Sequence, residues 1–322
     1  ILITLFLITF VVSLISVRPF IKTVTSEIKF TYVAKEYKSN FNKDDYKKKD
    51  STEFSVNKNQ DENYIGIDTQ ITLNLFENLK YDLKSIRLGQ SVKPVYLSKL
   101  PKDLKKIKST NKRKDTFIKI VMPLILSENE KILEDRNKLF RILGKQSNTM
   151  GEKVWLKRRF KDYGIKGEDI AELKLRMDIV PTSIAIAQAA KESGWGTSRF
   201  ALEGNAMYGQ WTWGGEGIEP SKKDKKKEHK ILKFPKLQSS VAAYMKNLNT
   251  HRGYSEFRDK RSKIREKKQE VNGLDLVDYL YNYAQTGSEY VKTLKIIIQQ
   301  NNLNDFDTSI LMNSSRSRSL TL

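Results

Sequence analysis

The stretch Ala187-Gln188-Ala189-Ala190-Lys191-Glu192-Ser193-Gly194-Trp195-Gly196-Thr197-Ser198 decides the interpretation of this sequence. Before it, Pro181 fits the first position of a helix, and residues 184–190 are almost all apolar. A helix that is apolar on every side is buried in a core. Gly194 tolerates the left-handed backbone conformation that ends many helices, so we expect Glu192 to lie in the last helical turn.

This position predicts an unusual carboxyl group at Glu192. The negative end of the helix dipole disfavours a carboxylate there, and a buried surface beneath it removes water. Both effects raise the pKa of a carboxyl group, as a general acid working near neutral pH requires. Trp195 would then form an apolar wall beside the acid and a platform for the face of a sugar ring. The spacing alone also allows a simpler interpretation, in which Glu192 is solvated and Trp195 is a core residue.

The composition excludes several classes of protein. The 322 residues contain no cysteine, which rules out disulfides, catalytic thiolates and cysteine-based zinc sites. The two histidines, His229 and His251, are too few for a multi-histidine metal site, so we expect no metal or cofactor. His251 lies in a polar turn, which is typical of a structural hydrogen-bonding role.

The charge of the chain limits its partners. A net charge of +21 favours the anionic polymers of a cell envelope, although lysines that merely solvate the surface would give the same charge. The sequence contains no zinc finger, basic zipper or RNA-binding signature, and we therefore expect no nucleic-acid partner. Nor does a glycine-rich phosphate loop open a helix after a strand, which disfavours nucleotide enzymes.

Changes of composition along the chain suggest five segments. Residues 1–17 form an apolar run that we interpret as a signal peptide or a membrane anchor, with the uncleaved anchor favoured. Residues 18–111 are rich in lysine, asparagine and aspartate and are expected to form a polar, partly disordered linker. We expect a helical lead-in over residues 112–150, the main folded domain over 151–308, and a disordered tail over 309–322.

Hydrophobic periodicity predicts a mainly helical domain with one small β-hairpin region. The expected helices cover residues 117–126, interrupted at Pro123, and residues 128–143, 169–177 and 184–192. Four further helices are expected to begin near Ser240, Ser255, Leu276 and Ser288. The expected strands cover residues 207–213 and 228–234, on either side of a lysine-rich tip at 222–227.

Three segments together resemble a known family. They are AQAAKESGWGTSRFALEGNAMYGQWTW (187–213), SVAAYMKNLNTHRGYSEFR (240–258) and YAQTGSEYVKTL (283–294), and Asn301-Asn302-Leu303 follows them. The combination resembles the Bax-type glucosaminidases, a peptidoglycan-cleaving branch of glycoside hydrolase family 73 with a mannosyl-glycoprotein endo-β-N-acetylglucosaminidase-like domain. The resemblance covers residues 112–310.

The resemblance implies a fold, an activity and a set of site residues. The implied fold is lysozyme-like α+β, mainly α, with a small β-hairpin lobe. The implied reaction is hydrolysis of the β-1,4 bond after N-acetylglucosamine in cell-wall glycan strands. The family's catalytic glutamate matches Glu192, and the tyrosine of its YA motif matches Tyr283. The residues that would line the substrate groove are Trp195, Tyr208, Gln210 and Trp213.

The remaining aromatic residues have more ordinary interpretations. Of Trp211 and Trp213, one is expected to face the groove and the other the core. Tyr244, Tyr279 and Tyr290 fall on apolar helical faces and are expected in the core.

The sequence does not fix a second carboxylate. Glycosidases commonly use two, and the distance between them sets the stereochemical outcome. In relatives the second acid lies on the hairpin lobe, where this chain has Glu216, Glu219 and Glu228. We assign Glu219 as the second catalytic carboxylate. A route with a single acid, assisted by the substrate's 2-acetamido group, stays open.

These observations favour an exported endo-β-N-acetylglucosaminidase that acts as a monomer on peptidoglycan. It would work at the periplasmic side of the cell envelope and be tethered to the inner membrane through residues 1–17. One alternative is a non-catalytic peptidoglycan-binding protein on the same fold, because no second acid is fixed. Another is a basic, membrane-tethered interaction protein whose folded domain is only a scaffold.

Overall fold

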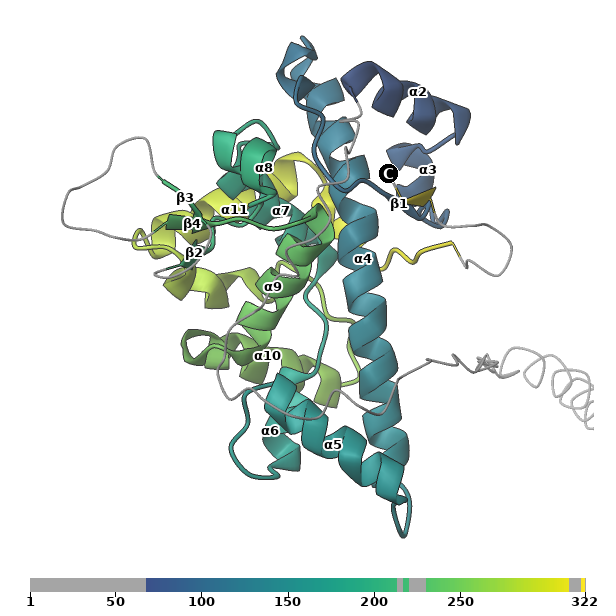
Figure 1. Ribbon diagram of the computed structural model, residues 1–322, viewed down its shortest axis with the longest axis vertical. Helices are drawn as coiled ribbons and strands as arrows, with labels where there is room; N and C mark the ends of the chain where they lie inside the picture. The colour runs from purple at the N-terminus through teal and green to yellow at the C-terminus, as the bar shows by residue number, and fades with distance from the viewer. Residues whose placement is uncertain (1–67, 213–216, 220–229, 313–319, 322) are drawn as a thin grey trace, which may run out of the picture. The chain divides into compact units, whose positions relative to one another are not determined.

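A computed structural model describes residues 68–212, 217–219, 230–312 and 320–321, all within one structural unit, Asn63–Leu322 (Figure 1). The α-helices are α2 (Thr69–Asn78), α3 (Leu83–Arg87), α4 (Thr110–Leu143), α5 (Met150–Asp162), α6 (Ile170–Arg176), α7 (Thr182–Ser193), α8 (Arg199–Gly204), α9 (Leu237–Thr250), α10 (Ser255–Glu266) and α11 (Ser288–Gln300). The 3₁₀ helices are η1 (Leu104–Lys106), η2 (Arg252–Tyr254), η3 (Val277–Tyr283) and η4 (Leu303–Phe306). The strands are β1 (Val95–Tyr96), β2 (Trp211–Thr212), β3 (Gly217–Ile218), β4 (Lys230–Leu232) and β5 (Leu320–Thr321).

The long helix α4 corrects the prediction of two helices over 117–126 and 128–143. It runs for 34 residues, with Pro123 buried inside it. Proline removes one helical hydrogen bond and costs about 3 kcal/mol or more. The apolar side chains around it each gain about 1.5–3 kcal/mol on burial, so together they outweigh that loss. Those fully buried neighbours are Phe117, Ile118, Ile120, Val121, Met122, Leu124 and Ile125.

Helix α7 lies in the centre of the core and packs against α4, α11 and η4. Residues 182–190 are all buried, which confirms the prediction from the apolar run. Pro181 is the residue before the first helical position, not the first position itself. Gly194 ends the helix in the left-handed conformation with φ 57°, as its sequence context indicated. In Figure 1, α7 and α9 both lie beside α4.

The small sheet confirms a β lobe, but the strands are shorter than predicted. Its order is β2-β4-β3, and both pairings are antiparallel. Ile231 in the central strand lies opposite Trp211 on one side and Ile218 on the other. The third strand, β3, was not predicted from the sequence. The fold class is therefore the expected one, mainly α with a small β lobe.

The expected linker over residues 18–111 is wrong for residues 68–111. This part forms α2, α3, β1 and η1, and it contributes core side chains that are nearly inaccessible to solvent. They are Phe76, Tyr81, Val92, Leu97, Leu100 and Leu104. Lysine and asparagine dominate the average composition and conceal these widely spaced apolar residues. Residues 18–67 lie outside the described part of the chain.

The expected disordered tail over 309–322 is also wrong where the structure describes it. Val92 N–H donates to Ile310 O at 2.8 Å, and Met312 N–H donates to Val92 O at 2.8 Å. Leu311 is buried between these two bonds. Strand β5 pairs in parallel with β1, so the two ends of the described unit close on each other.

Several helix boundaries differ from the predicted ones. Ser240 lies inside α9, where its Oγ accepts a hydrogen bond from Met207 N–H at 3.2 Å. The helix expected from Leu276 is the 3₁₀ helix η3. Helices α10 and α11 begin at Ser255 and Ser288 themselves, so neither serine is a capping residue.

The apolar run at residues 1–17 lies outside the described residues. Within the part of the chain that the structure does describe, no helix has both the length and the apolar character needed to cross a bilayer.

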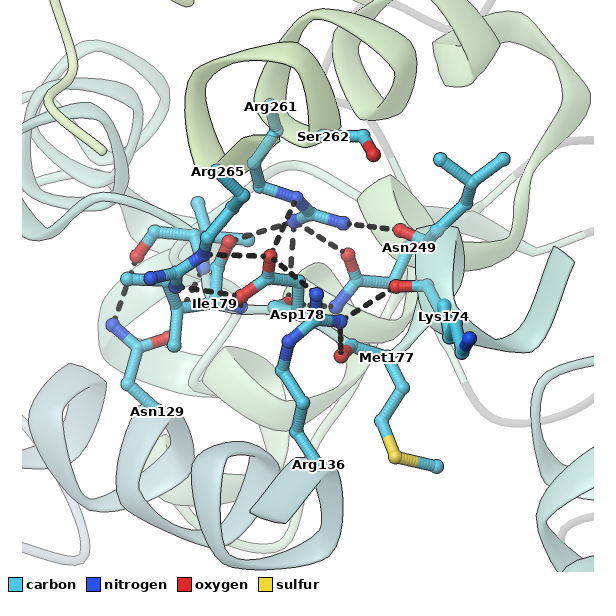
Figure 2. Close-up of polar contacts among 12 residues, drawn as sticks. Asn129, Arg136, Lys174, Met177, Asp178, Ile179, Asn249, Arg261, Ser262 and Arg265 are labelled. Atoms are coloured by element: carbon cyan, nitrogen blue, oxygen red, sulfur yellow. Dashed lines mark hydrogen bonds and ion pairs between the residues drawn. The ribbon is translucent and has the colours of Figure 1, made fainter. Parts of the chain in front are cut away.

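A buried charge cluster joins the segment before α7 to α4 and α10 (Figure 2). At its centre is Asp178, which is 2% exposed. Arg265 from α10 donates to both carboxylate oxygens, at 2.8 and 3.1 Å. Arg261 from the same helix and Arg136 from α4 approach Asp178 Oδ2 at 3.9 and 3.7 Å. Burial alone would raise the pKa of Asp178, but the three guanidinium groups outweigh it and hold that pKa below its usual range.

The arginines also satisfy backbone carbonyls in the last turn of α6 and in the segment between α6 and α7. Arg261 donates to Ile179 O at 2.6 Å and to Leu175 O at 2.9 Å. Arg136 donates to Met177 O at 2.7 Å. Asn129 on α4 exchanges two hydrogen bonds with the backbone of Val180. These hydrogen bonds therefore fix the position of the backbone segment that leads into α7.

We expect Asp178→Asn to lower the free energy of unfolding by about 3–5 kcal/mol at pH 7, because it leaves buried guanidinium groups without a counter-charge. A carboxylate with a lowered pKa stabilises the fold above its unfolded pKa and loses that effect as pH falls. The difference between the two proteins should therefore shrink below about pH 4. Urea denaturation across pH measures both effects.

The matched control is Asp162→Asn. Asp162 pairs with Arg159 at 2.7 Å, but its side chain is 45% exposed. The Asp162→Asn substitution should lower the free energy of unfolding by about 1 kcal/mol or less. Equal losses for both variants would contradict the assigned role of Asp178.

Candidate functional site

The start of α7 is capped from a distant part of the chain. Pro181 offers no side-chain cap. Asp307, which follows η4, accepts hydrogen bonds from Ser183 N–H at 2.7 Å and Ser183 Oγ–H at 2.8 Å. It also accepts from Gly273 N–H at 2.7 Å. Burial raises the pKa of Asp307 to about 6, while these donated bonds act in the opposite direction. The carboxyl group of Asp307 thus supplies the cap that the sequence near Pro181 lacks.

The end of α7 turns sharply because three successive residues are left-handed. Gly194, Trp195 and Gly196 have φ values of 57°, 57° and 76°. A side chain at Gly196 would meet the ring of Phe117 at 2.8 Å, so this position requires glycine. Trp195 is strained there, because a bulky residue rarely adopts positive φ.

Glu192 is half-buried in the last turn of α7. Burial raises the pKa of its carboxyl group, in the predicted direction. A hydrogen bond with the Tyr290 hydroxyl and the charge of Lys191 act in the opposite direction. Gly209, with φ 62°, lies against this carboxyl group, since a Cβ there would be 3.3 Å from Glu192 Oε2. The loop after α8 therefore lies directly beside the acid.

A buried chain of hydrogen bonds leads to Glu192. Gln188 is completely buried and lies one helical turn before Glu192 on the same face of α7. Tyr244 Oη–H donates to Gln188 Oε1 at 2.6 Å. Gln188 Nε2–H donates to Tyr290 Oη at 2.9 Å. Tyr290 completes the chain by its hydrogen bond with Glu192.

The two tyrosines of this hydrogen-bond chain each stack on a further tyrosine. The rings of Tyr208 and Tyr244 stack at 3.8 Å between centroids, and those of Tyr283 and Tyr290 stack at 5.4 Å. Tyr283 Oη–H donates to Tyr208 O at 3.0 Å, which fastens the loop beside Glu192. Burial raises the pKa of Tyr283, and the nearby charges of Tyr290 and Glu192 add to that rise.

The structure therefore brings two predicted catalytic residues, Glu192 and Tyr283, into one cluster. The predicted groove residue Tyr208 is different, because its side chain is 2% exposed and lies in the core. Its expected contact with substrate stays a prediction. Gln210 is half-buried, and within the described residues its Oε1 has no hydrogen-bond partner.

Trp195 lies beside the first turns of α4. Its ring packs edge-on against Phe117 at 5.9 Å, and Lys114 Nζ lies 4.9 Å from its centroid. It is half-buried and keeps an accessible part. Its role as a wall for Glu192 stays a prediction.

The β lobe carries the remaining predicted residues. Glu219 follows β3 and is exposed, and its backbone oxygen accepts a hydrogen bond from Arg199. Trp211 is 49% exposed. Which of Trp211 and Trp213 faces the groove stays a prediction. Trp213, Glu216 and Glu228 lie outside the described residues.

Sequence reasoning missed two groups that hold the site together. Tyr290 was predicted as core, and it is buried, but it also bonds to Glu192. Gln188 was a detectable signal, because it is a large polar residue in an apolar run, four positions before the acid. His251 does have the expected structural role and accepts a hydrogen bond from Gly253 N–H at 3.2 Å. Among the described residues, no three acidic or histidine side chains are grouped so that they could hold a metal ion.

Comparisons with known proteins cover the segment that contains the candidate site residues. A family model described as mannosyl-glycoprotein endo-β-N-acetylglucosaminidase matches residues 167–303, which include Glu192 and Tyr283. "Protein bax" of Escherichia coli (strain K12) is 35% identical over 210 residues, which cover 63% of this chain and 75% of that protein. The crystal structure of the catalytic domain of the Listeria monocytogenes autolysin Auto is matched with a TM-score of 0.31 and 20% identity. That match covers 54% of this chain and 97% of that domain.

We expect a titration of Glu192 by carbon-detected NMR to give a carboxyl pKa above 4.5, because the folded protein removes water from it. Tyr290→Phe should raise this pKa further, since it removes a hydrogen bond that stabilises the carboxylate. Tyr279→Phe in η3 is the control and should leave the titration unchanged. A fall in the pKa of Glu192 in Tyr290→Phe would contradict the assigned contact.

Proposed function

Because this chain belongs to the Bax-type branch of the glucosaminidase family, we propose that it hydrolyses peptidoglycan at the β-1,4 bond after N-acetylglucosamine. Glu192 is the general acid of this proposal. The observation that carries it is the half-buried carboxyl group of Glu192, with its raised pKa, at the end of a helix whose residues 182–190 are all buried. The substrate lies outside the cytoplasm, so the proposal includes export of the domain to the cell envelope.

The hydrogen-bond chain gives Glu192 a defined orientation. Tyr244 donates to Gln188 Oε1, which leaves the amide nitrogen of Gln188 to donate to Tyr290 Oη. Tyr290 therefore keeps its own proton for the carboxyl group of Glu192. One carboxyl oxygen is held by this phenol, and the other can carry the proton to the glycosidic oxygen. After the transfer, the same phenol stabilises the carboxylate that forms.

Tyr283 supports this arrangement from the opposite side. Its ring stacks on Tyr290, and its hydroxyl holds the backbone of Tyr208. We assign it the role of keeping Tyr290 and the loop at Gly209 against the acid. Gln210, with an unpaired acceptor among the described residues, is the groove residue best suited to bond with a sugar hydroxyl or acetamido N–H.

The second acid in this proposal is Glu219. It lies at the end of β3, in the lobe that follows Glu192 in the chain, and its exposure leaves it able to activate water. The non-catalytic alternative, a protein that binds glycan strands without cutting them, would share the fold and the groove. Hydrolysis and binding are therefore measured separately.

We expect Glu192→Gln to lower the release of N-acetylglucosamine reducing ends from purified sacculi by about 10²–10⁴-fold, which is the range for loss of a general acid. The fold should be no less stable at pH 7. A carboxyl group whose pKa is raised by folding opposes folding at a pH where it must ionise, and glutamine removes that cost. Glu203→Gln on α8 is the control, because this exposed acid forms a surface ion pair with Arg199 at 3.6 Å.

Unchanged lysis by Glu192→Gln would remove the proposed mechanism. If the native chain binds sacculi but releases no reducing ends, it is a binding protein. Reducing-end N-acetylmuramic acid among the products would instead identify a muramidase.

We expect Glu219→Gln to lower turnover of the same substrate by about 10²-fold or more, as loss of a base or nucleophile does. The anomeric configuration of the first product, followed by proton NMR, would then report inversion or retention. Full activity in Glu219→Gln would exclude a two-carboxylate route through this residue and support assistance by the 2-acetamido group.

A further inference from the structure

A pocket of about 260 Å³ lies between the first turns of α4 and the turn that ends α7. It is lined by Lys105, Thr110, Arg113, Lys114, Gly194, Trp195 and Thr197. Two of these residues, Gly194 and Trp195, follow directly after the last turn that holds Glu192. Consecutive Cα atoms are about 3.8 Å apart, so the Cα atoms of Glu192 and Gly194 are less than about 8 Å apart. The pocket is thus lined by residues that follow the proposed catalytic acid within three positions of the chain.

The pocket is strongly positive. Three of its lining residues are cations, and none of the described residues that line it is acidic. Thr110 is the first residue of α4, a helix of 34 residues with no acidic side chain in its first turn. Ser109 caps this helix by accepting a hydrogen bond from Lys112 N–H at 3.3 Å, and the dipole at the helix start still favours an anion. Side chains and backbone therefore contribute charge of the same sign.

Local contacts hold the walls in place. Lys114 Nζ lies over the Trp195 ring at 4.9 Å and donates to Asn301 Oδ1 at 3.2 Å. Arg113 donates to Ile107 O at 2.9 Å. Lys105 is exposed. The strained backbone of Trp195 presents part of an aromatic ring beside these cations.

We propose that this pocket is a subsite for a carboxylate carried by the glycan strand, next to the sugar whose bond is cleaved. The inference rests on the proposed function. Every second sugar of peptidoglycan bears a lactyl group, which either ends in a free carboxylate or continues into a stem peptide with carboxylates of its own. An aromatic ring beside cations suits such a substituent, because the ring packs on its apolar part while the lysines pair with the charge.

The test compares Lys105→Gln/Lys114→Gln with the control Lys108→Gln/Lys112→Gln, all in the full chain carrying Glu192→Gln. The control lysines are exposed neighbours that do not line the pocket. Binding is measured by co-sedimentation with intact sacculi, with sacculi stripped of stem peptides by an amidase, and with chitin, which has no carboxylate. Melting curves confirm that both double variants are folded.

We expect the pocket variant to bind intact sacculi about tenfold more weakly at low salt, with little difference at high salt. The control variant should bind like the parent, and the ratio of sacculus binding to chitin binding should fall only in the pocket variant. An effect that persists on stripped sacculi assigns the lactyl carboxylate, and one that disappears there assigns the stem peptide.

Equal losses on chitin and sacculi, or equal losses in the two double variants, would overturn the subsite. The same substitutions in the chain with Glu192 restored separate this result from the proposed function. If the parent releases no reducing ends but the binding difference persists, the subsite stands and the hydrolase proposal fails. If reducing ends are released and binding does not differ, the subsite is wrong.

Discussion

The burial of residues 182–190, which make up most of helix α7, is the constraint on which the other features depend. These residues have almost no contact with solvent, so their polar groups must be satisfied by the protein itself. The first turn lacks a local cap and is closed by Asp307, more than a hundred residues away in the sequence. The last turn leaves the core through Gly194 and Gly196, and only there does a side chain of this helix meet both the core and solvent. Glu192 occupies that position.

Two carboxyl groups, Asp178 before α7 and Glu192 in its last turn, show how the environment decides the ionisation state. Asp178 is the more deeply buried, yet three arginines keep its pKa low and make it a structural anion. Glu192 is only half-buried, but it has a phenol and one exposed lysine instead of guanidinium groups, and its pKa is raised. Counter-charge therefore outweighs burial at Asp178, whereas burial outweighs its weak partners at Glu192. The first arrangement fixes the chain, and the second prepares a proton donor.

The sequence predicted the features that depend on neighbouring residues. The buried alanine-rich helix, its glycine end, the position of Glu192 and the helical period after Pro123 all follow from local pattern, and the structure contains them. The prediction of helices and of ordered segments failed where local propensity and composition point one way and burial in the core points the other. Pro123 is a helix breaker by propensity, but α4 continues through it, and the buried apolar side chains around it outweigh its cost. Residues 68–111 are polar on average, although a few apolar residues such as Phe76 and Leu104 attach them to the core.

The sequence by itself determined that one carboxyl group would lie at the end of a buried helix, and motif resemblance linked that group to glycan cleavage. Only the tertiary structure decided its partners. Tyr244 and Tyr290 come from helices far along the chain, and their hydroxyls meet at Gln188 because packing brings α9 and α11 against α7. The same packing put Tyr208 in the core and turned Trp195 toward α4. The direction of a side chain in such contacts depends on the angle and distance at which two helices pack. The hydrophobic periodicity of one segment predicts which face is buried, but it does not predict that packing geometry.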